Sequence, residues 1–534
     1  MTRYFEPSAT TNHVAADVTD CVETPPRRFS FLFFERGRHR CDRIFKTMSY
    51  LRGPDRSQVE LLPACLDDYV AVNSSARFID VYVEGLDFVA LGFVHAQPKA
   101  TGRPPYHPAD LLKLYLYGYL QRIRSSRRLE AEAIRNLEVK WLLRALTPDF
   151  KTIADFRRDN RAAFKPLFKD FNLLCRRLNL FGAELVAIDG SKFKAVNNSR
   201  RHYTQEQLRE LIQKIESRID QYLGELDDQD AQTEGLPGAP SREDLEQKIT
   251  QLKQRRGRYD QLLGEMLQSG QNEVSLTDPD SRQMKGAHGE SFIGYNVQTA
   301  VDAKHGLIVA EQVVQAANDR GQLGAMAVAA QEALGVEKLQ AVADKGYHEA
   351  DQLEDCEQAG IETFVPEQGK TSGRSKDGQE VFPKDRFTYD PTADAYQCPG
   401  GQSLARSSVG DNRGKERLLY YNRAACAHCP LKAQCTTSTH RVIGRRVNEA
   451  VVERAALRVA ARPDLVAARK KIVEHPFGTL RTWRHDHFLM KGLEKVRAEW
   501  SLSSLVYNLR RVLSLVKSDQ WLAAVTVSVP ALSS

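Results

Sequence analysis

Two aspartates each follow an apolar run of strand length in this chain of 534 residues. Asp189 follows residues 184–188, and Asp344 follows residues 339–343. An aspartate after a strand is most often a turn residue, because its side chain accepts hydrogen bonds from nearby backbone amides. Two such carboxylates on neighbouring strands can also hold divalent cations, which prefer oxygen ligands. The pair therefore predicts a metal-dependent centre for phosphoryl transfer, in which two ions about 3.5–4 Å apart act on the attacking and leaving oxygens.

A third carboxylate is expected from a C-terminal helix that packs against the sheet. Glu474 is the best candidate, because it lies in the basic segment 469–481, which could bind a phosphodiester backbone. Glu494 and Glu499 are the alternatives. Pro476 disfavours helical geometry at the residue before it, so we expect it to disturb a helix through Glu474.

The segments between these carboxylates alternate between strand and helix patterns. Residues 291–301 and 307–314 predict a β-hairpin, because both runs are rich in β-branched and aromatic residues. A helix is expected from about 321 to 334, and a last strand at 361–365. The order of strand, hairpin, helix, strand, helix and strand, with a helical C-terminus, predicts an α/β fold.

We expect the chain to divide into four parts. Residues 1–47 combine clustered arginines and aromatic residues without a sustained period, which favours a disordered or non-native extension, with Met48 as the natural start. Residues 48–180 are mostly helical in pattern. The α/β catalytic domain covers residues 181–515, and residues 516–534 form a C-terminal tail.

The helical part carries most of the positive charge. Residues 101–180 contain 17 Lys or Arg and 8 Asp or Glu, whereas the whole chain has a net charge of +7. A local basic field favours a polyanionic partner, most simply nucleic acid, although a solvated helical face is the alternative. Thr152 and Asp155 have the spacing of a helix N-cap for residues 156–180.

Two insertions interrupt the catalytic domain. Residues 202–271 show apolar positions at heptad-like spacing on two arms, separated by a segment rich in Asp, Gly and Pro. They predict an antiparallel helical hairpin, which serves as a spacer, a DNA clamp or a dimerisation element. Residues 367–460 form a second, cysteine-rich insertion, which we expect to have little apolar core of its own.

Four of the nine cysteines lie in this second insertion. Four soft ligands that include a Cys-x2-Cys pair are the number a closed tetrahedral zinc site requires. The alternative is a loop with free thiols, and His428 is an alternative ligand. The expected zinc ligands are Cys398, Cys426, Cys429 and Cys435.

No apolar run approaches about 18 residues, and the N-terminus lacks the layout of a signal peptide. We therefore expect no membrane partner and a cytoplasmic location.

Four segments of the chain resemble a known family, the DDE transposases of bacterial insertion sequences. They are Arg103-Pro-Pro-Tyr-His-Pro108, Ala187-Ile-Asp-Gly-Ser-Lys192, Ala343-Asp-Lys-Gly-Tyr347 and Val473-Glu-His-Pro-Phe-Gly478. In related transposases a Tyr-x2-Arg-x3-Glu-x6-Lys signature surrounds the glutamate. Here Ala467 stands at the tyrosine position, Lys470 at the arginine position and Arg481 at the lysine position.

The resemblance implies an RNase H-like mixed sheet flanked by helices, with Asp189, Asp344 and Glu474 as the catalytic triad holding two Mg²⁺ or Mn²⁺ ions. It implies a DNA transposase that binds terminal inverted repeats, cleaves the strands by hydrolysis and joins the 3′-hydroxyl ends to target DNA. A homodimer on double-stranded DNA is expected, associated with the bacterial nucleoid when it is bound to DNA. The alternatives are a catalytically inactive DNA-binding protein and a stand-alone nuclease. The expected phosphate contacts are Lys192, Lys194, Lys345, Lys470 and Arg481.

Overall fold

The structure is a computed structural model. It describes residues 65–524, except 98–103, 198–200, 232–240, 287–288, 368, 370–377, 413–414, 518–519 and 522–523. The expected extension at residues 1–47 and the start at Met48 lie outside the described residues. None of the described helices is long and apolar enough to span a bilayer.

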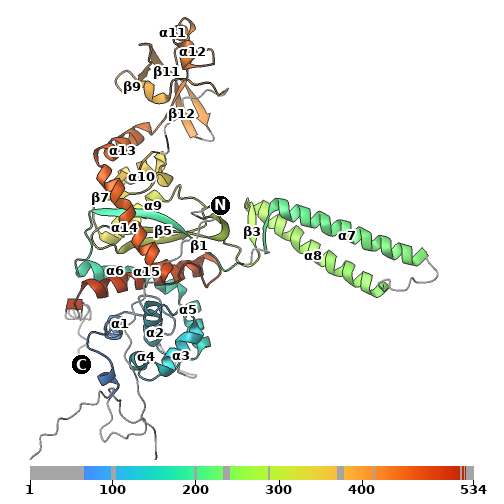
Figure 1. Ribbon diagram of the computed structural model, residues 1–534, viewed down its shortest axis with the longest axis vertical. Helices are drawn as coiled ribbons and strands as arrows, with labels where there is room; N and C mark the ends of the chain where they lie inside the picture. Colours follow the sequence, from blue (N-terminus) through green and yellow to red (C-terminus); the bar gives the residue numbers. More distant parts are fainter. Residues whose placement is uncertain are drawn as a thin grey trace, which may run out of the picture. The chain divides into compact units, whose positions relative to one another are not determined.

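The first described part of the chain is a group of short helices (Figure 1). The expected N-cap at Thr152 is wrong: Asp149 caps the helix instead and accepts hydrogen bonds from the backbone amides of Lys151 and Thr152. Residues 156–180 are therefore divided between two helices. The helices are α1 (Ser75–Glu84), α2 (Pro108–Leu120), α3 (Ser126–Arg135), α4 (Leu137–Leu142), α5 (Phe150–Asp159) and α6 (Phe164–Arg177).

A mixed sheet follows, in the order β4-β5-β1-β7-β8, with β6 also paired to β5. β1 is antiparallel to β5 and parallel to β7, and β7 is parallel to β8. This order and these directions define an RNase H-like sheet, which confirms the expected fold class. The strands are β1 (Leu185–Lys194), β4 (Arg282–Lys285), β5 (Ser291–Asp302), β6 (Ile308–Val314), β7 (Leu339–Val342) and β8 (Ile361–Phe364).

Helices cover the sheet (Figure 1). α9 packs against β1, β5 and β6, α14 contacts β1, β5 and β7, and α15 contacts β6 and α6. The expected disturbance at Pro476 is wrong, because α14 continues through this buried proline. These helices are α9 (Leu323–Leu334), α10 (Ala350–Gln358), α13 (Glu449–Ala461), α14 (Pro463–Thr482) and α15 (Leu493–Leu515).

One hydrophobic core joins the helical part to the sheet, because its buried side chains run from Val70 to Trp521. Trp521, in the stretch expected to be a tail, packs at 4.7 Å against the ring of Phe78 on α1. A buried ion pair crosses the same junction. Arg124, after α2, pairs with Glu499 on α15, and their side chains are 8% and 1% exposed. The same arginine donates to the carbonyl oxygens of Arg484 and His487.

The first insertion is the expected helical hairpin. α7 (Gln205–Ala231) and α8 (Arg242–Ser269) pack along a shared apolar seam, and β2 (His202–Thr204) pairs with β3 (Glu273–Ser275) at its base. Arg256 on α8 forms a 2.7 Å ion pair with Glu216 on α7, across the two arms. The two short strands were not expected from the sequence.

The second insertion contains an antiparallel five-stranded sheet in the order β13-β12-β11-β10-β9. The expectation of little apolar core is wrong: Phe387, Tyr396, Leu404, Tyr420 and Ile443 form a separate buried cluster. The elements are β9 (Thr388–Asp390), β10 (Ala395–Gln397), β11 (Ser403–Asn412), β12 (Lys415–Tyr420), α11 (Arg423–Ala427), α12 (Lys432–Cys435) and β13 (Ile443–Arg446).

The buried ion pair leads to a stability prediction. Glu499→Gln should lower the free energy of unfolding by about 3–5 kcal/mol, because it leaves the buried charge of Arg124 without its partner. Urea denaturation measures the change. Glu494→Gln is the matched control, since this exposed glutamate forms only a 3.5 Å surface pair with Arg161. Equal stability of the two variants would contradict the assignment.

Candidate active site

The sheet register brings the two aspartates together. The parallel pairing of β1 with β7 ends at Ala187 and Val342, and each aspartate lies two residues beyond this pair. Because side chains alternate along a strand, Asp189 and Asp344 point to the same face of the sheet as these two residues. The expectation that β1 ends at Asp189 is wrong, since the strand continues to Lys194 and pairs there with β5.

Asp344 lies after β7 and caps the short 3₁₀ turn η4 (Lys345–Tyr347). Its carboxylate accepts a 2.7 Å hydrogen bond from the backbone amide of Gly346. This bond is the turn geometry typical of an aspartate after a strand. The two readings of Asp344, turn residue and cation ligand, are therefore compatible, because one carboxylate has several acceptor positions.

The Asp189 carboxyl is in an unfavourable place for a negative charge. Its pKa is raised from 3.8 to about 6: burial is the largest cause, the Arg469 guanidinium acts to lower the pKa, and the carboxylates of Asp344 and Asp319 act to raise it. Neighbouring carboxylates resist a common negative charge, and a divalent cation removes that repulsion. The donor set therefore fits a hard cation such as Mg²⁺ or Mn²⁺.

Arg469 on α14 provides positive charge at this place. Its guanidinium lies 3.2 Å from the Asp189 carboxylate, and the two side chains are 19% and 22% exposed. Val473, Pro476 and Leu480 on the same helix are buried, and their spacing from Arg469 puts it on the inward-facing side. The sequence analysis did not single out Arg469, although this apolar spacing would have identified it.

Glu474 lies on the flank of α14. Its carboxylate is 63% exposed and forms a 3.7 Å ion pair with Lys470 one turn earlier. Arg481, two turns later on the same flank, donates a 2.6 Å hydrogen bond to the hydroxyl of Ser191 on β1. Ser191 points to the same sheet face as Asp189, so this flank borders the aspartate pair. Among the described residues, no hydrogen bond or ion pair connects Glu474 to either aspartate.

The two alternative glutamates lie elsewhere. Glu499 accepts hydrogen bonds from the backbone amides of Leu489 and Met490 in addition to its pair with Arg124. Glu494 is 80% exposed and pairs with Arg161. The contacts of Glu494 and Glu499 therefore explain their positions without a role beside the aspartates.

A third aspartate that the sequence analysis missed lies behind β1. Asp319, in the loop between β6 and α9, accepts hydrogen bonds from Asn296 at 2.9 Å and from Gln298 at 2.8 Å. These amides are paired with Lys192 and Gly190, on the face opposite to Asp189. A Cβ at Gly190 would lie 2.3 Å from Asp319, so only glycine permits this approach.

The same amides position the turn that carries Asp344. Tyr347 donates a hydrogen bond to the side-chain oxygen Oε1 of Gln298, and the side-chain Nε2 of Gln298 in turn donates to Asp319. Burial raises the pKa of Tyr347 well above its ordinary range, so the phenol keeps its proton. The signal in the sequence was two amides in a strand that is otherwise apolar, because buried amides require partners.

The expected phosphate contacts lie in several places. Alternation along β1 puts Lys192 and Lys194 on the face opposite to Asp189, and Lys194 lies 5.9 Å from the ring of Phe292. Lys345 is exposed in the η4 turn, directly after Asp344. Lys470 and Arg481 flank Glu474 on α14.

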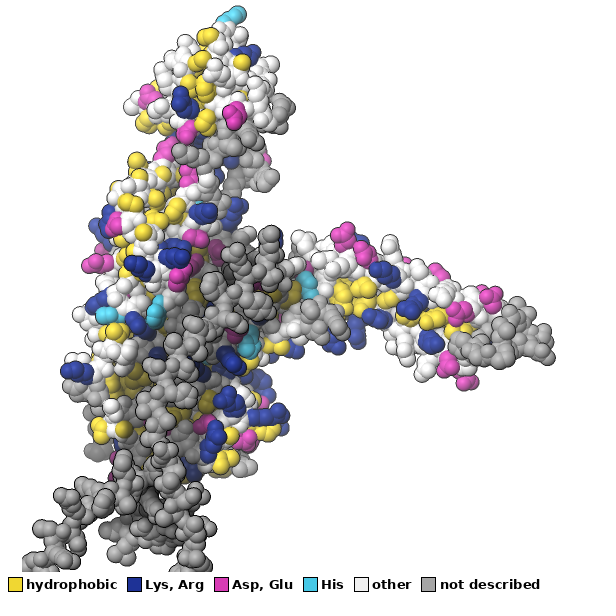
Figure 2. Space-filling model, viewed as in Figure 1, with side chains coloured by type: hydrophobic (Ala, Val, Ile, Leu, Met, Phe, Trp, Pro, Cys, Tyr) yellow, Lys and Arg dark blue, Asp and Glu magenta, His cyan; other side chains and the backbone are white. Residues whose placement is uncertain are grey.

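Basic side chains also gather on the helical part, over α3 and α5 (Figure 2). Arg127 lies 5.0 Å over the ring of Phe150 and remains exposed. A surface of this kind suits the phosphate backbone of nucleic acid. Its exposed members are Arg122, Arg127, Arg128, Arg135 and Lys151.

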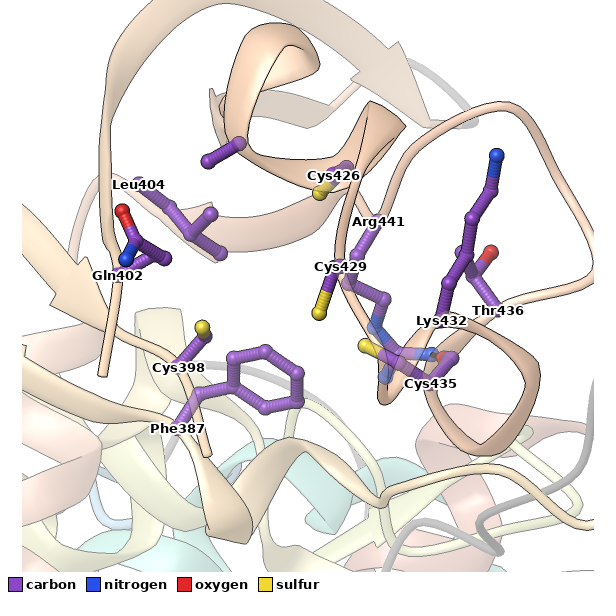
Figure 3. A pocket seen from close by; sticks show the side chains of 11 residues that line it. Phe387, Cys398, Gln402, Leu404, Cys426, Cys429, Lys432, Cys435, Thr436 and Arg441 are labelled. Carbon is purple, nitrogen blue, oxygen red and sulfur yellow. Dashed lines mark hydrogen bonds between the residues drawn. The ribbon is translucent and has the colours of Figure 1, made fainter. Parts of the chain in front are cut away.

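The four expected zinc ligands line one small pocket in the second insertion (Figure 3). Phe387, Leu404 and Arg441 line the same pocket. His428 is exposed and does not line this pocket. In the part of the chain that the structure describes, no three His, Cys, Asp or Glu side chains are close enough together to hold a metal ion as they stand.

The raised pKa of Asp189 leads to a prediction for metal-free protein. Its stability should fall as the pH rises from about 4 to about 6, because the folded carboxyl releases its proton near pH 6 and the unfolded one near 3.8. The expected loss is about 2 kcal/mol, after allowance for partial exposure. Asp189→Asn should lack this component. Urea denaturation in EDTA across this pH range measures the loss of stability. Identical pH profiles for the wild type and Asp189→Asn would contradict the prediction.

Two protein families match the chain. Residues 64–159 match the family described as Transposase domain (DUF772), and residues 397–513 match the family described as Transposase DDE domain. The first match covers helices α1 to α5. The second includes the four cysteines of the pocket and Glu474, and the two aspartates lie between the two matches.

No curated protein matches the chain. Among solved structures, the chain is similar to a cryo-EM structure of a piggyBac transposase synaptic complex with hairpin DNA, at 9% identity over 86% of each chain and a TM-score of 0.22. A similarity at this level supports no further inference. The chain therefore contains a transposase domain at residues 64–159 and a transposase DDE domain at residues 397–513, and these two matches support a DDE transposase of an insertion sequence.

Proposed function

We propose that this transposase binds the terminal inverted repeats of its element, cleaves the DNA strands by metal-dependent hydrolysis and joins the 3′-hydroxyl ends to target DNA. The observation that carries the proposal is the placement of Asp189 and Asp344, two residues beyond the same register pair of β1 and β7. Carboxylates on adjacent parallel strands form a fixed acceptor pair on one face of the sheet. A rigid pair of this kind suits in-line displacement at phosphorus.

Asp189, Asp344 and Glu474 would hold the divalent ions, Mg²⁺ or Mn²⁺. When bound, two such ions activate the attacking oxygen and stabilise the leaving oxygen. Glu474 must leave Lys470 to join the aspartates. An exposed ion pair of this kind contributes only about 0.2–1 kcal/mol, so a change of rotamer costs little.

Arg469 would supply positive charge beside the Asp189 carboxylate until the ions bind. It lies on the Asp189 carboxylate and lowers the pKa that burial raises. Protons and divalent ions compete for this carboxylate, since both bind its oxygens. Metal affinity should therefore increase as the pH rises through about 6.

The surface around the aspartates would guide the DNA. Arg481 is fixed to β1 through Ser191 and lies 5.6 Å over the ring of Phe193, so its position relative to Asp189 is determined by the sheet. Lys345 and Lys470 extend positive charge along the same region. The exposed arginines of α3 supply a second basic surface, which would bind the terminal repeats. We expect a homodimer that holds the two ends of the element.

Asp189→Asn should abolish strand cleavage while DNA binding persists, because it removes a metal ligand and leaves the basic surfaces unchanged. A loss well above 100-fold is expected, since even residues that only support a ligand change activity by about 10–100-fold. Labelled DNA carrying the two ends of the element, incubated with Mg²⁺, reports binding, cleavage and joining separately. Asp344→Asn and Glu474→Gln should behave in the same way.

Glu494→Gln is the control, and it should cleave like the wild type. Cleavage by Asp189→Asn at the wild-type rate would refute the assignment of the site. Binding without cleavage by the wild type would favour an inactive DNA-binding protein. Cleavage without joining would favour a stand-alone nuclease.

A further inference from the structure

The four thiols of the second insertion converge from three separate segments. Cys398 follows β10, Cys426 lies in α11 with Cys429 just after it, and Cys435 ends α12. All four side chains face one cavity of about 20 Å³ (Figure 3). Space of this size accommodates a single water or ion.

Four thiols, which are weak hydrogen-bond partners, and the apolar side chains of Phe387 and Leu404 line this cavity. The other polar lining residues are Gln402, Lys432, Thr436 and Arg441. The cysteines are free rather than joined in disulfides. A soft cation is the occupant that four such sulfurs prefer.

Arg441 provides a second, independent argument for a metal ion in this cavity. Its guanidinium donates to the carbonyl oxygens of Cys435 and Phe382 at 3.0 and 2.9 Å, and its Nε is buried without a hydrogen-bond partner. No carboxylate among the described residues forms an ion pair with it. A half-buried positive charge without a carboxylate partner is stabilised by negative charge nearby.

Four thiolates around one Zn²⁺ carry a net charge of −2, which Arg441 would partly neutralise. The backbone is also shaped for the sulfurs. Gly401 donates to the Cys398 carbonyl oxygen at 2.8 Å and has a φ of 74°, which closes a tight turn behind Cys398. A Cβ at Gly400 would lie 3.7 Å from the sulfurs of both Cys398 and Cys429, so these two sulfurs share one small region.

We propose that Cys398, Cys426, Cys429 and Cys435 bind one structural zinc ion, with Arg441 as the neighbouring counter-charge. Binding forms four Zn–S bonds of about 2.3 Å and releases the four thiol protons to solvent. The sulfurs must draw together from their present arrangement, in which no three are close enough to coordinate one ion. The ion would fasten α11 and α12 to the turn after β10, at one end of the five-stranded sheet. This inference does not depend on the catalytic proposal.

Elemental analysis of the full chain, purified under reducing conditions, should give one zinc per chain. Replacement by Co²⁺ should give the charge-transfer and visible bands of a tetrahedral thiolate site. Removal of zinc with a chelator should make four additional thiols reactive towards a thiol reagent. Wild-type protein that lacks stoichiometric zinc, or that contains disulfides between these cysteines when isolated, would overturn the proposal.

Variants locate the ion. Cys429→Ser should lose zinc, whereas Cys65→Ser, which changes an exposed cysteine outside the insertion, should retain it. Arg441→Met should weaken zinc binding by about 10–100-fold in chelator competition and leave one zinc per chain at saturation. Retention of zinc by Cys429→Ser, or unchanged affinity in Arg441→Met, would contradict the site as described.

Discussion

The repulsion between the carboxylates of Asp189 and Asp344 is the constraint on which the rest of this structure depends. Two acidic side chains on one sheet face favour protonation or separation, and burial makes their common ionisation harder still. The fold resists separation through the parallel register of β1 and β7. It resists protonation through Arg469, which α14 places on the Asp189 carboxylate. A site that binds divalent cations must be prepared in this way, since its ligands must stay together before the ions arrive.

The support for this pair extends well beyond its immediate neighbours. Gln298 connects Tyr347, in the turn after Asp344, to Asp319 behind β1. Asn508 on α15 bonds both to Asn172 on α6 and to the backbone of Ile308 on β6, which joins the helical part to the sheet. Because one core spans both parts, DNA held by the basic helices would lie at a defined place relative to the aspartates. A flexible connection between the helical part and the sheet would leave the position of the DNA relative to the aspartates undefined.

Much of the fold follows from local patterns in the sequence. The runs before Asp189 and Asp344 identify two strands, and the apolar seam of residues 202–271 identifies the helical hairpin, because these features depend on near neighbours. The five-stranded sheet of the second insertion was missed, since its strands are short and its core consists of a few aromatic residues. Pro476 misled for a similar reason: tertiary packing of α14 outweighs the local preference of a single proline.

The candidate site divides in the same way. Asp189 and Asp344 were proposed because each follows an apolar run of strand length, and the cysteines because of their spacing. Arg469 and Asp319 could not be found so directly, since their roles come from contacts between segments far apart in the chain. Glu474 is proposed from its sequence context; its exposed side chain pairs with Lys470, and no hydrogen bond or ion pair among the described residues links it to either aspartate.

We expect Asp189 to exchange Arg469 for a divalent cation, and crystals soaked in Mn²⁺ and measured at the manganese absorption edge would test this exchange. An anomalous peak should lie between the Asp189 and Asp344 carboxylates, with the Arg469 guanidinium displaced from its 3.2 Å contact. Arg469 still in place with no peak beside the two aspartates at saturating Mn²⁺ would contradict it.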